Sequence, residues 1–202
     1  MRFVRRIPPT DQELSTKLVT DAWSKIKEPN NLLTATLTSV PFIIINGLFS
    51  MLIIIQFYNP LINISGNYSF SVTMNILDII FFIMSTFILI IVHELIHMIF
   101  IPDFMKSDKI YWGITLNGGF VATTEKISKR RFIMISIMPY FLLSIVLPII
   151  LGVCNILNSF IVFLIIVNAM ASSVDILNLF LILCQTPKNS YIINNGFETY
   201  YK

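Results

Sequence analysis

Charged residues are scarce in this sequence. They make up 12% of the 202 residues, whereas 55% are hydrophobic, and the mean hydropathy is +0.79. Soluble domains carry about a quarter charged residues, so the composition excludes an ordinary soluble domain. The first 31 residues lack the apolar stretch of a cleavable signal peptide, and we expect the mature protein to keep its N-terminus.

Basic residues are absent from two of the loops between apolar segments. Four stretches exceed the about 20 residues that a membrane-spanning helix needs: residues 32–58, 74–101, 132–154 and 159–184. The connections 59–73 and 155–158 contain no Lys or Arg, and all 14 basic residues lie in segments 1–31, 102–131 and 186–202. By the positive-inside rule these three segments are cytoplasmic.

The expected fold is therefore an all-α polytopic protein of the cell membrane. Its domain of four transmembrane helices spans residues 32–185 and includes the cytoplasmic loop 102–131. A cytoplasmic amphipathic segment, 1–31, precedes this domain, and a cytoplasmic tail, 186–202, follows it. Both termini are then cytoplasmic.

Histidine occurs only twice, at His93 and His97, inside the second apolar stretch. With Glu94 they form an H-E-x-x-H motif, which on a helix places both imidazoles on one face, able to share a zinc ion. Glu94 is then a candidate general base. The alternative is that the three side chains only hydrogen-bond to neighbouring helices. Because ionisable groups within a membrane are costly, the motif favours the metal site.

A catalytic zinc site normally has three protein ligands, so a third is needed. Asp78 lies 15 residues before His93, about 22 Å along the helix, which is too far for the two side chains to bind the same metal ion. Asp175 lies about 15 Å from the cytoplasmic end of the fourth helix, close to the depths of about 12 and 6 Å for His93 and His97. We therefore predict Asp175 as the third ligand, and expect Asp78 to pair with polar groups near the outer interface.

The two cysteines end different apolar stretches. Cys154 closes the third at the outer face and Cys184 ends the fourth at the inner face, nearly a bilayer apart. A disulfide requires Cα atoms within about 7 Å, so an intramolecular bridge is excluded. Packing roles are expected for both, and a zinc-ligand role for Cys184 is a minor alternative.

The N-terminal segment has the signature of a helix start. Residues 10–13, Thr-Asp-Gln-Glu, match a capping box. Apolar residues follow at four-residue intervals: Leu14, Leu18, Ala22 and Ile26. The pattern predicts an amphipathic helix over residues 11–27 on the cytoplasmic membrane surface, with Trp23 at the level of the headgroups. A short soluble helix packed against the cytoplasmic loop fits the pattern equally well.

The loop after the HELIH helix contains a hairpin signal. Residues 110–116 and 120–124 are rich in β-prone side chains, and Asn117-Gly118-Gly119 separates them. An Asn-Gly pair between such runs predicts a β-hairpin. The hairpin either borders the active site and offers an edge to an extended peptide, or merely covers the helix ends.

These motifs together resemble intramembrane metalloproteases of the site-2 protease type. The resemblance is closest to a family of small bacterial membrane proteins described as zincin peptidases, and it covers about residues 74–183. Site-2 proteases carry an upstream Asn, usually a Pro, and Asp-Gly in the aspartate segment. This chain has Asn168 and Asp175, but Ile176 replaces the Gly and no Pro lies between them. That departure favours the small zincin group. The resemblance implies that Asn168 contacts substrate.

The expected function is hydrolysis of a peptide bond near the cytoplasmic face of the membrane. Zn²⁺ held by His93, His97 and Asp175 would activate a water molecule, with Glu94 as the general base. The expected partners are the lipid bilayer and a membrane protein or peptide substrate, with no nucleic acid. The substrate's identity and the oligomeric state are left open.

Two other functions fit part of the pattern. A membrane metal-ion transporter also places histidines and acids in transmembrane helices, but it needs a relay of ligands, and no histidine lies outside HELIH. A non-catalytic scaffold that retains the motif is the other alternative.

Overall fold

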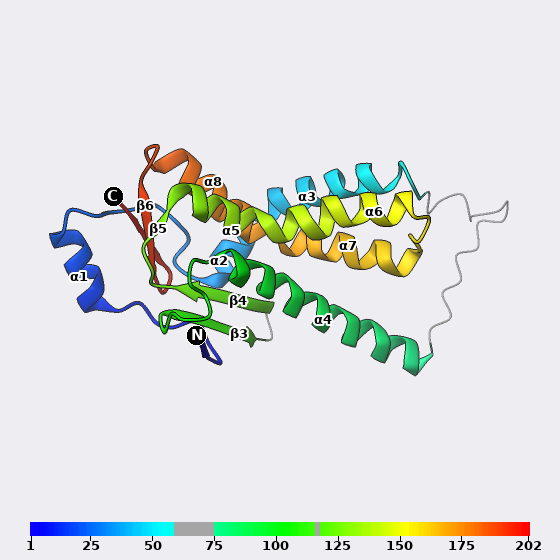
Figure 1. Ribbon diagram of the computed structural model, residues 1–202, viewed down its shortest axis with the longest axis horizontal. Helices are drawn as coiled ribbons and strands as arrows, with labels where there is room; N and C mark the ends of the chain where they lie inside the picture. Colours follow the sequence, from blue (N-terminus) through cyan, green and yellow to red (C-terminus); the bar gives the residue numbers. More distant parts are fainter. Residues whose placement is uncertain (59–74, 116–117) are drawn as a thin grey trace.

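The protein is described by a computed structural model that covers residues 1–58, 75–115 and 118–202. It is an elongated bundle of helices with two small β-sheets at one end (Figure 1). Both ends of the chain lie at the end of the molecule that carries the sheets. The last turns of α3 (Val40–Ile54) and the first turns of α4 (Ile76–Phe100) lie at the opposite end.

Helices form most of the bundle. They are α1 (Gln12–Thr20), α2 (Leu32–Thr38), α3 (Val40–Ile54), α4 (Ile76–Phe100), α5 (Lys129–Phe141), the π-helix η1 (Leu142–Val146), α6 (Leu147–Val153), α7 (Ser159–Ala171) and α8 (Ser173–Gln185).

Three of the described helical segments are long and apolar enough to cross a membrane: Ile76–Phe100, Lys129–Val153 and Ser159–Gln185. The helices α2 and α3, bent by 55° relative to each other, pass the same test only as a pair. The spans therefore number three, or four if the bent pair counts as one. Their positions match the four predicted stretches, while the four-span topology and its orientation stay predictions.

Most apolar residues of helix α4 are exposed or only partly buried, and three of its four buried residues are polar. It starts at Asn75, whose side chain accepts from the Asp78 N–H, while the Asp78 carboxylate accepts from the Asn75 N–H, both at 3.0 Å. Asp78 thus pairs with a polar group at the helix end, as predicted, while its location near the outer interface stays a prediction. The buried residues of α4 are His93, Glu94, His97 and Met98. In lipid, this polar cluster determines which face of α4 turns toward the bundle.

The other spans are interrupted. The third contains Pro139, η1 and Pro148, and the fourth is interrupted by a turn at Ser172, whose hydroxyl donates to the Asn168 carbonyl at 2.8 Å. Ser39, at the bend between α2 and α3, contacts the hydroxyl of Ser173 at 3.1 Å. Two helix breaks therefore meet inside the bundle, where hydroxyl groups satisfy backbone and side-chain polar atoms.

The expectation of an all-α fold needs correction, because the described chain contains two sheets. The first has the order β1 (Arg2–Phe3), β3 (Ile110–Thr115), β4 (Gly118–Thr123), with β1 parallel to β3 and β3 antiparallel to β4. The second is antiparallel and has the order β2 (Ser24–Lys25), β7 (Glu198–Tyr201), β6 (Tyr191–Asn195), β5 (Ile127–Ser128). The hairpin predicted after the HELIH helix is present as β3 and β4, and its residues 116–117 lie outside the described residues.

The helix predicted over residues 11–27 is confirmed only for its first part, α1, and is wrong after residue 20. Helix α1 ends at Thr20, Ala22 adopts a positive φ of 60°, and β2 pairs with β7. The N-cap is Asp11, which accepts from the N–H groups of Glu13 and Leu14, and not Thr10. Strand pairing with the C-terminal hairpin overrides the helical periodicity after residue 20.

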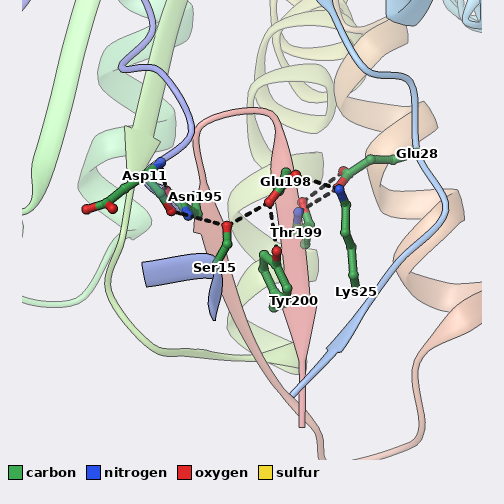
Figure 2. A network of polar contacts seen from close by, with 8 residues as sticks. All are labelled: Asp11, Ser15, Lys25, Glu28, Asn195, Glu198, Thr199 and Tyr200. Atoms are coloured by element: carbon green, nitrogen blue, oxygen red, sulfur yellow. Dashed lines mark hydrogen bonds and ion pairs between the residues drawn. The ribbon is translucent and has the colours of Figure 1, made fainter. Parts of the chain in front are cut away.

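Polar contacts join α1 to the C-terminal hairpin β6–β7 (Figure 2). The Asn195 amide donates to the Asp11 carbonyl at 2.7 Å and to the Ser15 hydroxyl at 2.9 Å. The Ser15 hydroxyl in turn donates to Glu198 at 2.8 Å. Residues 186–202, expected to be a tail, therefore form part of the folded end of the molecule.

A second set of contacts joins the strand β2 and the residues after it to β7 (Figure 2). Lys25 forms an ion pair with Glu198 at 2.6 Å, and Glu28 accepts from the N–H and hydroxyl of Thr199 at 2.5 and 2.9 Å. The N-terminal segment is thus integrated into both sheets, through β1 and β2. The sequence leaves open a helix on the membrane surface or a helix packed against the cytoplasmic loop, and it predicts neither of these strand pairings.

Candidate metal centre

The HELIH motif lies in the last two turns of α4, on its buried face. His93 and His97 are four residues apart, so their rings are neighbours on one side of the helix, with centroids 4.9 Å apart. Each of the two residues is 7% exposed and Glu94 is 8% exposed. Burial of three ionisable residues on one face of an apolar helix requires polar partners from other elements.

Asp175 is the partner that both histidines share. It occupies the first turn of α8, where the helix dipole favours a carboxylate. One carboxylate oxygen lies 3.2 Å from His93 Nε2 and the other lies 3.5 Å from His97 Nε2. The structure therefore brings together, from two spans, the three residues that the sequence analysis selected.

This arrangement fits a zinc ion. The ligand atoms of His93, His97 and Asp175 all lie within 4.8 Å of one another. Bonds of about 2.0–2.2 Å around a tetrahedral ion separate neighbouring ligands by roughly 3.3–3.6 Å. The distance of 3.5 Å from His97 to one Asp175 oxygen lies in this range, and the distance of 3.2 Å from His93 to the other oxygen lies just below it. Two imidazoles and one carboxylate are also a donor set of catalytic zinc sites, which keep one position open. That His93, His97 and Asp175 bind zinc stays a prediction.

The other nitrogen of each imidazole is held by the protein. His97 Nδ1 lies 2.8 Å from the Ile135 carbonyl, which only accepts, so Nδ1 carries the hydrogen. His93 Nδ1 lies 2.9 Å from Asn168 Oδ1. The amide of Asn168 is oriented by its NH₂ group, which donates to the Pro139 carbonyl at 3.3 Å and the Ser144 hydroxyl at 2.9 Å. Both imidazoles therefore direct an unprotonated Nε2 toward Asp175 when a metal is bound.

Asn168 was predicted to contact substrate. Its side chain is 1% exposed, and both ends of its amide bond to the protein. These contacts support a role in holding His93, while substrate binding by Asn168 stays a prediction. Cys184 is exposed and does not belong to the cluster of ligand atoms found among the described residues. Both cysteines are free.

Glu94 packs against the hairpin. A Cβ atom added to Gly119 of β4 would lie 2.4 Å from Glu94 Cγ and 2.7 Å from its Oε1. Only glycine permits this approach of the strand to the carboxylate. Sequence reasoning treated Gly119 as part of the turn, and the Gly-Gly pair itself gave no indication of this contact.

A cavity of about 730 Å³ contains the cluster. All four residues of the predicted centre line it: His93, Glu94, His97 and Asp175. The strand β4 lines it along Gly118–Thr123, and residues of α2, α3 and the β6–β7 turn line other parts. The cluster is thus accessible from a space large enough for several residues of a peptide.

Glu28 lines the same cavity from the sheet-bearing end of the molecule. Burial raises the pKa of its carboxyl to about 7, although the hydrogen bonds from Thr199 and the charge of Lys25 act in the opposite direction. Part of the polar network in Figure 2 therefore borders the space that reaches the candidate metal centre.

Comparison with known proteins places the chain in a family. No curated protein and no solved structure matches it. A family model described as "Putative zincin peptidase" matches residues 86–191, which is just over half of the chain and includes HELIH, the hairpin and Asp175. The chain belongs to this zincin peptidase family.

Proposed function

We propose that this protein is an intramembrane zinc metallopeptidase that cleaves a membrane-associated protein or peptide near the cytoplasmic face. One observation carries the proposal: His93, His97 and Asp175 converge beside Glu94 in a cavity bounded by apolar helices. Membership of the zincin peptidase family supports the zinc and the hydrolytic chemistry.

The side chains have separate roles in this reaction. His93, His97 and Asp175 would hold a zinc ion, which would supply Lewis-acid chemistry that lowers the pKa of a water molecule and polarises the scissile carbonyl. Glu94 accepts the proton of the attacking water and passes it to the leaving amine. The bonds from Asn168 and Ile135 keep the imidazoles oriented, so little rearrangement is needed when the substrate arrives.

The edge strand β4 provides a site for the substrate backbone. It is the last strand of the β1–β3–β4 sheet, lines the cavity over its whole length and contacts Glu94 through Gly119. An extended peptide that adds to β4 would expose its carbonyl groups to the centre, whereas a helical peptide keeps them hydrogen-bonded. A transmembrane substrate must therefore unwind locally before cleavage.

A metal transporter is less well supported. Such a protein needs successive metal ligands along its path. Within residues 1–58, 75–115 and 118–202, the group His93, His97 and Asp175 is the single cluster of three or more suitable ligands.

The test compares new protein N-termini in membranes that contain the unsubstituted protein or its Glu94→Gln variant. We expect the unsubstituted protein to generate N-termini within or beside hydrophobic segments of other membrane proteins. These should disappear with Glu94→Gln and with a zinc chelator. Identical sets of N-termini in all three samples would contradict the proposed function.

A further inference from the structure

Pro139 lies inside α5, four residues after Ile135. Proline has no N–H, so it cannot donate to the carbonyl four residues earlier in a helix. In the structure, the Ile135 carbonyl instead accepts from His97 Nδ1 at 2.8 Å. Any other residue at position 139 would present an N–H to that carbonyl and compete with the imidazole.

The carbonyl of Pro139 contributes to the orientation of the second histidine. It accepts from the Asn168 amide at 3.3 Å, and the other end of this amide accepts from His93 Nδ1 at 2.9 Å. Pro139 and Asn168 are both almost completely buried. The backbone around one proline therefore reaches both histidines, directly at His97 and through Asn168 at His93.

The π-helix η1, which follows α5, completes this support. Its Ser144 accepts from the Asn168 amide at 2.9 Å and donates to the Ile165 carbonyl of α7 at 3.1 Å. Single π-helical turns are frequent at functional sites because they change the direction of nearby groups. The irregular part of the third span thus holds Asn168 in one orientation.

We infer that Pro139 is a positioning residue for the metal centre. It leaves the Ile135 carbonyl available to His97 and helps hold Asn168 against His93, so that both imidazoles present Nε2 to Asp175. This inference rests on the proposed function, because it takes the two histidines as zinc ligands. It adds a role for a residue that touches neither metal nor substrate.

The same span contains a matched control. Pro148 is as buried as Pro139 and lies four residues after Ser144, whose carbonyl accepts from the Ser50 hydroxyl at 3.1 Å. As at Pro139, a side chain from another helix bonds to the carbonyl four residues earlier, but here that side chain is a serine on α3. Pro148→Ala therefore restores an N–H near the Ser144 carbonyl, while the Ser144 hydroxyl that accepts from Asn168 and both histidines keep their own partners.

The experiment measures zinc affinity of the full-length protein in detergent by competition with a chelator. We expect Pro139→Ala to raise the Kd for zinc by about 10- to 100-fold, the usual effect of losing groups that orient metal ligands. Pro148→Ala should leave the Kd close to that of the unsubstituted protein. With cobalt(II) in place of zinc, the visible absorption bands should shift in Pro139→Ala and stay unchanged in Pro148→Ala.

Unchanged zinc affinity in Pro139→Ala, or an equal loss in Pro148→Ala, would overturn the inference. If Pro139→Ala does not purify as a folded protein, Asn168→Ala is measured instead. We expect the same rise in the Kd for zinc, and an unchanged Kd would again overturn the inference. Absence of zinc binding by the unsubstituted protein would instead overturn the proposed function, so the two failures are distinguishable.

Discussion

Glu94 and the two histidines are neighbours on α4 but have different surroundings. The imidazoles are held from both sides, by Asp175 at Nε2 and by Asn168 or Ile135 at Nδ1. Glu94 faces the cavity and the Gly119 backbone, and it is not one of the converging ligand atoms. The proposed metal binding and the proposed proton transfer therefore fall to separate residues.

This separation predicts the behaviour of Glu94→Gln. The variant should keep its zinc, because no ligand is removed, and should lose peptide-bond cleavage by at least about two orders of magnitude, because an amide cannot accept the proton. Zinc content and cleavage of a substrate identified from the membrane comparison would be measured on the same preparation. Undiminished cleavage by Glu94→Gln would show that Glu94 is not the general base.

The sequence predicted some features of the centre at this scale and could not predict others. The four-residue spacing of the histidines indicates their common face, and the similar depths of Asp175 and HELIH indicate their proximity. The contacts of His93 with Asn168 and of His97 with Ile135 depend on how α4, α5 and α7 pack. A proline inside an apolar span indicates an unoccupied carbonyl at position 135, but not which side chain uses it.

At the scale of elements, the strand β4 and the helix α4 restrict each other at Gly119. Gly119→Ala should displace the Glu94 side chain, because the added Cβ would lie 2.4 Å from its Cγ. We expect the rate of cleavage to fall by about 10- to 100-fold, because small misplacements of catalytic groups reduce rates by such factors. The zinc content should stay unchanged. Gly47→Ala is the control, since its Cβ would meet only Met170 at 3.5 Å. Equal activity of Gly119→Ala and Gly47→Ala would argue against the contact.

The burial of Glu28 predicts a pH dependence of stability. The pKa of Glu28 is raised to about 7 in the folded protein from 4.5, so the folded state binds the proton more tightly. This contribution is complete below pH 4.5 and is lost as the pH rises through 7. Thermal unfolding in detergent should show a larger fall in Tm between pH 5 and 8 for the unsubstituted protein than for Glu28→Gln. Parallel curves would exclude Glu28 as the titrating group.

Elements at the sheet-bearing end were harder to predict than the spans. The spacing of apolar residues through Ile26 continues beyond Thr20, yet the chain leaves the helix because residues 24–25 pair with β7. The C-terminal strands did carry a local signal. Asn195-Gly196 separates two β-prone runs, as Asn117-Gly118 does, and Gly196 has a φ of 62°. The remaining strands are too short for periodicity to identify.

At the scale of the whole molecule, both chain ends lie beside the sheets (Figure 1). This position agrees with the prediction that both termini lie on the same side of the membrane. The positive-inside rule predicts that this side is cytoplasmic. With Cys154 and Cys184 replaced, a membrane-impermeant maleimide applied to intact cells should label Ser65→Cys and not Lys109→Cys. Labelling of Lys109→Cys alone would reverse the orientation and move the proposed cleavage to the outer face.

The most direct test of the account is the zinc content of detergent-purified protein, because the proposed ligands come from two spans that only the fold brings together. We predict about one zinc per chain in the unsubstituted protein and in Asp78→Ala, whose carboxylate caps the far end of α4. Asp175→Ala should lose zinc affinity by one or more orders of magnitude. Full zinc content in Asp175→Ala, or none in the unsubstituted protein, would contradict the metal centre.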